Sequence, residues 1–364
     1  MQVTCELYHD QIFHSAVHND GWCWSPLNPN LFDVNLRLID ESGKILDSVQ
    51  TYFGLRKIEA KDGIIYLNNR PYIQKLVLDQ GYWRDGGLTA PNDQAFVTDI
   101  KLAKQMGFNG CRKHQKCEDP RFLYWADKLG YLVWGEMASC PEFSELAVQR
   151  TFHEWADVIE RDYNHPSIVT WVGLNESWGV PFISQNKKQQ SFALALYYFI
   201  KSLDATRLVV SNDGWEITKS DICTIHNYMH GNENEEDVKC SFFENISDRD
   251  KMLTYMSAGR PIYVEGFQYD GVPMILSEFG GISYKSETSG NWGYTTVKSS
   301  DEFLRTYQRL IDSIKSAHHL WGYCYTQLSD VEQETNGLVT ADRCCKVDPE
   351  KIKEMNDQVR YLLP

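Results

Sequence analysis

Short apolar runs alternate with helical patterns from about residue 72 onward, and this alternation limits the possible folds more than any other feature of the chain. Between the runs, apolar residues recur at helical spacing, as in the segment that begins at Phe303. We count eight apolar runs that read as strands, and one of them directly precedes Arg112. The other seven cover residues 72–78, 131–134, 168–172, 208–211, 222–226, 274–277 and 320–325.

Eight strands that alternate with helices over about 300 residues predict a (β/α)₈ barrel. An open doubly wound sheet would have fewer strands or a glycine-rich nucleotide turn, and the chain contains neither a G-x-G-x-x-G motif nor a P-loop. One step is irregular, because only about ten residues separate the fifth strand from the sixth, too few for a crossover helix. We therefore expect a barrel whose fifth helix is degenerate.

The chain before the barrel contains strand patterns and no helix. Residues 31–38 and 45–53 alternate around a turn at 41–44, which predicts a β-hairpin. Turn residues on both sides of 64–67 predict a second, smaller hairpin at the junction with the barrel. The boundary between this strand module and the barrel is expected near residue 60.

Composition and charge exclude several classes of protein. With 42% hydrophobic and 24% charged residues, the chain is neither disordered nor collagen-like. The 50 acidic and 36 basic side chains give a net charge of −14, which would repel a phosphate backbone, so we expect no nucleic-acid partner. No apolar stretch approaches ~18 residues and residues 1–10 lack a signal-peptide pattern, so no membrane contact is expected. The scattered cysteines form no C-x-x-C pair and indicate reduced thiols in a cytoplasmic protein.

Two glutamates follow apolar runs at the ends of facing strands. In a barrel of this kind, reacting groups lie at the carboxyl ends of the strands. Glu176 ends the fourth strand and Glu278 ends the seventh. A single glutamate in such a position is more often half of a salt bridge. Two of them, with Asn175 and Trp178 beside one, suit glycoside hydrolysis, in which carboxyl groups ~5 to 5.5 Å apart permit a retaining double displacement.

The segments around these glutamates carry a family resemblance. Residues 174–179 (LNESWG) and 273–281 (PMILSEFGG) resemble the two catalytic signatures of glycoside hydrolase family 2, which contains β-galactosidases, β-glucuronidases and β-mannosidases. Residues 24–32 and 52–58 are similar to the end of the immunoglobulin-like sandwich that leads into the barrel of that family. The resemblance covers roughly residues 20–345. It implies a partial immunoglobulin-like sandwich at 1–59 and a (β/α)₈ catalytic barrel at 60–364.

The resemblance also implies roles for the residues of the site. Glu176 would be the general acid/base, Glu278 the nucleophile, and Asn175 a hydrogen-bond partner of the hydroxyl beside the reacting carbon. In this mechanism Glu176 holds a proton until the glycosyl-enzyme forms, because the negative charge of Glu278 disfavours its ionisation, and it then acts as a base towards water.

Supporting residues are predicted around this pair, and each has an alternative explanation as a core or surface residue. The family often has Arg and His after the second strand, where Arg112 could hold Glu278 ionised. Tyr228 resembles the tyrosine that hydrogen-bonds the nucleophile, and Tyr325 stands where much of the family has a tryptophan under the sugar. The remaining candidates for contact with the substrate are Asp79, His114, Trp178 and Trp292.

Two other functions stay open at this point. A metal-dependent hydrolase would need His114, His226 and His230 to converge, but no H-x-H follows the first strand and no His pair lies on one helical turn, so we expect no metal and no cofactor. The second is a catalytically impaired carbohydrate-binding barrel, since we expect only the tail of the sandwich and not the N-terminal jelly-roll domain that usually precedes it. Exposed strand edges would also favour self-association, so a homo-oligomer stays among the alternatives.

The predicted function is a retaining β-glycoside hydrolase with a carbohydrate substrate. The N-x-K signature that binds the carboxylate in β-glucuronidases is absent after Glu278, so glucuronides are less expected as substrates. Residues 276–281 also depart from the C-E-Y-x-H pattern of the large bacterial β-galactosidases. A β-galactosidase-like activity is therefore only weakly favoured, and mannosides and other β-linked sugars stay open.

Overall fold

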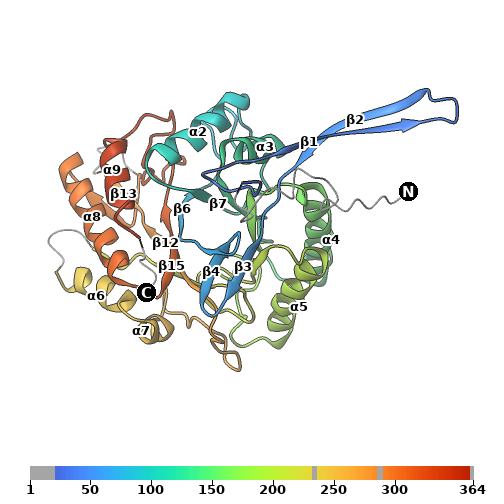
Figure 1. Ribbon diagram of the computed structural model, residues 1–364. Helices are drawn as coiled ribbons and strands as arrows, with labels where there is room; N and C mark the ends of the chain where they lie inside the picture. The colour runs from blue at the N-terminus through green and yellow to red at the C-terminus, as the bar shows by residue number, and fades with distance from the viewer. Residues whose placement is uncertain (1–20, 232–235, 285–289, 361–364) are drawn as a thin grey trace.

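The computed structural model describes residues 21–231, 236–284 and 290–360, and its main feature is an eight-stranded sheet of parallel strands. The strand order is β10-β9-β8-β7-β6-β15-β12-β11. Successive barrel strands are neighbours except β10 and β11, which lie at the two ends of this order, and the sheet curls into a nearly closed barrel inside a ring of helices (Figure 1). This confirms the predicted (β/α)₈ barrel. The strands are β6 (Gln74–Asp79), β7 (Gly110–Lys113), β8 (Leu132–Glu136), β9 (Ile168–Val172), β10 (Leu208–Val210), β11 (Cys223–Asn227), β12 (Met274–Gly280) and β15 (Leu320–Thr326).

The helices turn an apolar stripe towards the outer face of the barrel. In α8, for example, Phe303, Tyr307 and Leu310 are fully buried while the opposite face is polar. Helix ends follow local chemistry: in α3 the Asp119 side chain accepts the Arg121 N–H, and Gly130 ends the helix at a φ of 68°. The helices are α2 (Asp93–Gln105), α3 (Pro120–Leu129), α4 (Glu145–Asp162), α5 (Lys187–Leu203), α6 (Glu236–Ile246), α7 (Arg249–Thr254), α8 (Ser300–Ser316) and α9 (Pro349–Asn356).

The step from β10 to β11 contains no helix, as the short spacing predicted. Residues 211–222 instead form a tight loop that joins the two strands at the seam of the barrel. Asp221 closes this seam, because its backbone N–H donates to Val209 O at 2.8 Å and its carboxylate accepts the Val209 N–H at 2.9 Å. The loop is short enough to bring Asn212, Asp213 and Glu216 close to the mouth of the barrel, where they matter for the site.

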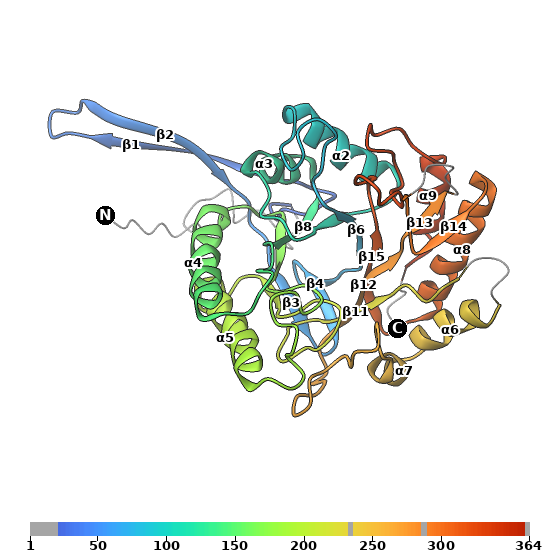
Figure 2. The ribbon, with the colours of Figure 1, turned by 180° about the vertical axis from the view of Figure 1, so that it is seen from behind.

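Strands that precede the barrel form two separate units. The hairpin of β1 (Phe32–Ile39) and β2 (Ile45–Phe53) projects away from the barrel in both views (Figures 1 and 2). The sheet of β3 (Ile58–Lys61), β4 (Ile64–Leu67) and β5 (Arg70–Pro71) packs into the barrel interior, where Ile58, Ile65 and Leu67 share a buried cluster with Leu76 and Trp134.

The predicted division into a sandwich remnant at 1–59 and a barrel at 60–364 stays a prediction. Part of the first unit, residues 1–20, lies outside the described residues. Two short strands that no sequence pattern predicted, β13 (Ile282–Tyr284) and β14 (Thr295–Val297), pair with each other beyond the end of β12. Within the described residues, no helix combines the length and the apolar character that crossing a bilayer requires.

Candidate active site

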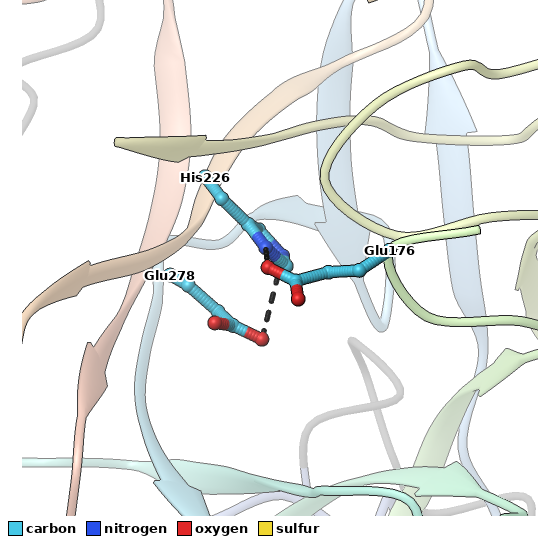
Figure 3. A group of neighbouring side chains, drawn as sticks. All are labelled: Glu176, His226 and Glu278. Atoms are coloured by element: carbon cyan, nitrogen blue, oxygen red, sulfur yellow. Dashed lines mark hydrogen bonds and ion pairs between the residues drawn. The ribbon is translucent and has the colours of Figure 1, made fainter. Parts of the chain in front are cut away.

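Glu176 and Glu278 meet at the mouth of the barrel. A carboxylate oxygen of Glu176, a carboxylate oxygen of Glu278 and a ring nitrogen of His226 all lie within 4.8 Å of one another (Figure 3). Glu176 follows β9 and is about one quarter exposed, whereas Glu278 lies in β12 and is almost completely buried. The two carboxylates therefore face one small space from opposite sides of the barrel.

The turn that carries Glu176 has an unusual backbone. Glu176 and Ser177 have φ values of 50° and 58°, in the left-handed region that costs energy for residues other than glycine. Backbone contacts with the loop after β10 hold this turn: the Glu176 N–H donates to Asp213 O at 3.0 Å, and the Ser177 N–H donates to the Asn212 side chain at 3.0 Å. The short β10–β11 loop thus fixes the direction of Glu176.

A buried carboxylate supports this turn from behind. Glu216 accepts hydrogen bonds from the hydroxyls of Ser177 and Ser184, each at 2.5 Å, and forms an ion pair with Arg260 at 2.7 Å. Glu216 therefore anchors the residue next to Glu176 and acts on the site through it.

The Glu278 carboxylate is held in its ionised form. Arg112 Nη1 donates to Oε1 and the Tyr228 hydroxyl donates to Oε2, both at 2.6 Å. Burial alone would raise the pKa of Glu278, but the positive charges of His226 and Arg112 outweigh burial and lower it. An ionised carboxylate with two donors in place is the state that a carboxylate nucleophile requires.

Arg112 connects four strands beneath the site. Its guanidinium is completely buried and contacts Glu278, Asp213 at 2.6 Å, Glu136 at 2.9 Å and the Asn175 side-chain oxygen at 2.6 Å. Burial of Glu136 raises its pKa to about 7 although the nearby Arg112 lowers it. Arg112 thus positions Glu278 and also Asn175, the residue that precedes Glu176.

His226 bridges the two sides of the site. Its Nδ1 lies 2.7 Å from Glu176 Oε1 and its Nε2 lies 2.8 Å from Asp213 Oδ2. Burial would lower the pKa of His226, but the charges of Glu278 and Asp213 outweigh it and raise the pKa to about 10. His226 is therefore an imidazolium that donates from both nitrogens.

The three side chains Glu176, His226 and Glu278 form an ion-pair network. Both ring nitrogens of His226 lie within hydrogen-bond distance of carboxylates, Nδ1 of Glu176 and Nε2 of Asp213. The expectation that the site works without a metal stays a prediction.

Replacing His226 by glutamine is expected to change how stability depends on pH. Because the folded-state pKa of His226 is about 10 and its ordinary value is 6.5, its stabilising effect is complete below pH 6.5 and is lost as pH rises towards 10. The free energy of unfolding of the wild type, from urea denaturation, should therefore fall between pH 7 and 9.5 by at least about 1 kcal/mol more than that of His226→Gln.

The control for this experiment is His153→Gln, which removes an exposed histidine on α4. This variant should follow the wild type across the pH range. Equal pH dependence in the wild type and in His226→Gln would contradict the charged state assigned to His226.

His114 and Tyr228 lie beside Glu278, and their contact with a substrate stays a prediction. His114 Nδ1 is 3.8 Å from Glu278 Oε1 and its side chain is 22% exposed. Burial, aided by the charge of Arg112, lowers the pKa of His114 to about 4, so it is neutral and can accept or donate a hydrogen bond. The ring of Tyr228 stacks on Tyr294 with a centroid separation of 3.5 Å. These two aromatic rings form one wall of the site.

The two predicted tryptophans are exposed, Trp178 near Glu176 and Trp292 near the wall of tyrosine rings. Trp178 is 56% exposed and follows the Glu176 turn, and Trp292 packs its edge on Tyr294 at 5.7 Å. Both rings are available to a ligand, and their contact with substrate stays a prediction.

The structure does not bring Asp79 and Tyr325 into contact with the two glutamates. Both Asp79 oxygens are used elsewhere, one by Lys113 Nζ at 2.6 Å and the other by the Gly81 N–H at 2.7 Å. Tyr325 is fully buried in the barrel wall and packs edge-on against Phe279 at 5.6 Å. Asp79 anchors the loop after β6 and Tyr325 fills the wall, and the contact of either residue with a sugar stays a prediction.

Sequence reasoning missed several residues of the site. Asp213 and Glu136 follow the apolar runs of β10 and β8, so a search for every acid at a strand end would have found them. Glu334 and Tyr294 lie in loops without a recognisable motif. Glu334 is half-buried and accepts a hydrogen bond from the Gln80 amide at 3.2 Å. His226 was noted only as the end of a strand and as a metal ligand.

Comparison with known proteins identifies the family. The model for the TIM barrel domain of glycosyl hydrolases family 2 matches residues 58–361, and a second model of glycosyl hydrolases family 2 matches residues 9–56. The chain belongs to glycosyl hydrolase family 2. This agrees with the resemblance that the two glutamate segments carry.

Relatives within the family have several recorded activities. A putative β-glucuronidase of Formosa agariphila is 32% identical over 194 residues, which is 50% of this chain and 23% of the relative. A β-galactosidase of Photobacterium profundum is 28% identical over 229 residues, which is 59% of this chain and 21% of the relative. The chain therefore spans less than a quarter of the length of these curated relatives.

Solved structures support the same fold. A family 2 β-galacturonidase from Eisenbergiella tayi, bound to galacturonate, superimposes with a TM-score of 0.70 at 22% identity, covering 92% of this chain and 59% of that one. A β-D-glucuronidase of Dictyoglomus thermophilum gives a TM-score of 0.73 at 17% identity, covering 92% and 59%. At these identities the likeness speaks for the fold alone.

Proposed function

We propose that the chain is a retaining β-glycoside hydrolase that uses Glu278 as nucleophile and Glu176 as general acid/base. The observation that carries this proposal is the distance of at most 4.8 Å between a Glu176 oxygen and a Glu278 oxygen. A spacing near 5 Å suits double displacement, whereas inverting enzymes separate the two carboxyl groups by roughly 6.5 to 9.5 Å to admit a water. The ionised state of Glu278 supports the same assignment.

The chemistry proceeds in two steps. Glu278 attacks the anomeric carbon while Glu176 gives its proton to the departing oxygen, and a covalent glycosyl-enzyme forms. Glu176 then removes a proton from water, which displaces Glu278 and releases the sugar with its original configuration. His226 occupies Glu176 Oε1, so we assign the proton transfer of both steps to the other oxygen, Oε2.

The charges around the site favour a neutral sugar such as a β-galactoside over a uronide. Arg112 and His226, the described cations in contact with the two glutamates, are each already paired with carboxylates. Glu334 adds a further carboxylate, and burial and the charge of Glu278 raise its pKa. A sugar carboxylate would meet negative charge here, because none of these cations is left to neutralise it. The β-galactosidases among the sequence relatives fit this preference.

A panel of 4-nitrophenyl β-glycosides tests the proposal. The galactoside is expected to give a kcat/KM at least ~10-fold above those of the glucuronide and the galacturonide, since Arg112 and His226, the described cations that contact the two glutamates, are already paired. Proton NMR of the first product formed should show the β-anomer.

Other outcomes would identify the alternatives. A first product of α configuration would contradict double displacement. Faster turnover of a uronide would contradict the neutral-sugar preference. Sugar binding without turnover of any member of the panel would instead indicate a carbohydrate-binding barrel.

A further inference from the structure

A cavity of about 530 Å³ opens beside Glu176. It lies among the residues that follow β11, the inner face of α6 and the segment after α7. Its size is within the ~300 to 1,000 Å³ that ligand pockets occupy. The apolar part of its lining comprises Trp215, Met229, Tyr255, Met256 and Tyr294.

The cavity is on the leaving-group side of the site. In a displacement at the anomeric carbon, the nucleophile and the leaving oxygen lie on opposite sides of that carbon, and the general acid lies next to the leaving oxygen. Glu176 lines the cavity and Glu278 does not. Tyr228 marks the border, because its hydroxyl donates to Glu278 while its ring lines the cavity.

Several polar groups of the lining already have partners within the protein. The Ser257 hydroxyl donates to His226 O at 2.5 Å, and the Tyr255 hydroxyl donates to the Asn227 side chain at 3.3 Å. The Asn245 amide donates to the Ser241 hydroxyl at 3.1 Å. The Trp215 indole N–H has no hydrogen-bond partner among the described residues and is the one buried donor left in the described lining. A second sugar would need several donors and acceptors for its hydroxyls, and these contacts leave few.

The apolar groups of the lining are available to a ligand. Met229 and Met256 are 53% and 52% exposed, and they lie with aromatic rings around one space. Apart from Glu176 and His226, none of the described lining residues carries a charge. Thioether and aromatic side chains bind flat apolar groups well, because they offer a large polarisable surface with little loss of hydration.

We propose that this cavity binds the leaving group and selects planar aromatic aglycones over a second sugar. The inference rests on the proposed function, since it assigns the leaving-group side from the roles of Glu176 and Glu278. The substrate class is then aryl β-glycosides in which the aromatic group exceeds a single ring.

The test compares phenyl and 2-naphthyl β-glycosides of the sugar selected by the panel, galactose in the expected case. Phenol and 2-naphthol have similar acidity, so a difference in kcat/KM reports contact with the aromatic group. The naphthyl glycoside is expected to exceed the phenyl glycoside by ~5- to 10-fold, from the extra apolar area buried. Met256→Ala should reduce this ratio to about 2 or less.

Two controls separate the cavity from the chemistry. Leu46→Ala, on the projecting hairpin, removes an equally exposed apolar side chain and should leave the ratio unchanged. The β-glycosyl fluoride has no aglycone, so its turnover reports the two glutamates alone.

Failure of the inference and failure of the proposed function give different results. If the fluoride is hydrolysed but the naphthyl to phenyl ratio is near 1 and Met256→Ala does not change it, the inference is overturned. If no glycoside is hydrolysed, the proposed function fails, and calorimetric binding of 2-naphthol decides on the cavity: binding weakened severalfold by Met256→Ala supports it, and absence of binding overturns it.

Discussion

Glu278→Ala is expected to abolish turnover of an activated substrate such as 2,4-dinitrophenyl β-galactoside, with a loss of kcat/KM of about 10⁴-fold or more. The variant removes the only atom that forms a bond to the anomeric carbon in the first step of the proposed mechanism. Folding is expected to survive, because Arg112 keeps its contacts with Glu136 and Asp213, and His226 keeps those with Asp213 and Glu176. Steady-state kinetics measures the loss.

Added azide identifies the role of the missing carboxylate. In Glu278→Ala, azide enters the vacated space and attacks the anomeric carbon once, so the product is the α-glycosyl azide and activity returns. Rescue also shows that the variant is folded. A β-glycosyl azide would assign Glu278 as the acid/base instead, and full activity without azide would remove it from the mechanism. Glu41→Ala, in the exposed turn of the β1–β2 hairpin, is the control for loss of a carboxylate.

The barrel was predictable because its strands are buried on both faces. Strands of this kind read as continuous apolar runs, and seven of the eight could be assigned directly from such runs. The missing fifth helix followed from the short interval between β10 and β11. In contrast, β13 and β14 have only three residues each and lie between loops, so their pairing depends on tertiary contacts that local sequence does not encode.

The meeting of the two glutamates was predictable from their place at strand ends, but their neighbourhood was only partly so. The alternation of side chains along β11 and β12 is interrupted, with a shift of register between Ile225 and His226 that brings His226 opposite Glu278. Such a bulge reverses which side chains point to the barrel mouth, so counting residues along the strand cannot predict it. This is why the bridging role of His226 was missed.

Asp79 shows the limit of strand-end position as a criterion. Its position at the end of β6 is as favourable as that of Glu278, and the sequence alone cannot separate the two. The difference lies in the neighbours: Asp79 is bound by Lys113 on β7 and by the Gly81 N–H, whereas an oxygen of Glu278 lies within 4.8 Å of an oxygen of Glu176. Strand-end position therefore predicts candidates, and the distance between the carboxylates distinguishes them.

Glu176→Ala is expected to impair substrates in proportion to their need for a proton. An aryl glycoside with a poor leaving group, such as the phenyl glycoside, should lose ~10²- to 10⁴-fold in kcat/KM, the usual contribution of a general acid. The leaving group of the 2,4-dinitrophenyl glycoside, dinitrophenolate, departs without protonation. Formation of the glycosyl-enzyme from this substrate should therefore be affected far less. The second step lacks the base that activates water, and the glycosyl-enzyme should therefore accumulate and give a burst of dinitrophenol in a stopped-flow experiment.

Azide, which needs no base, should speed the second step and yield the β-glycosyl azide, the anomer opposite to that from Glu278→Ala. Equal losses on both substrates, without a burst, would contradict the assignment of Glu176.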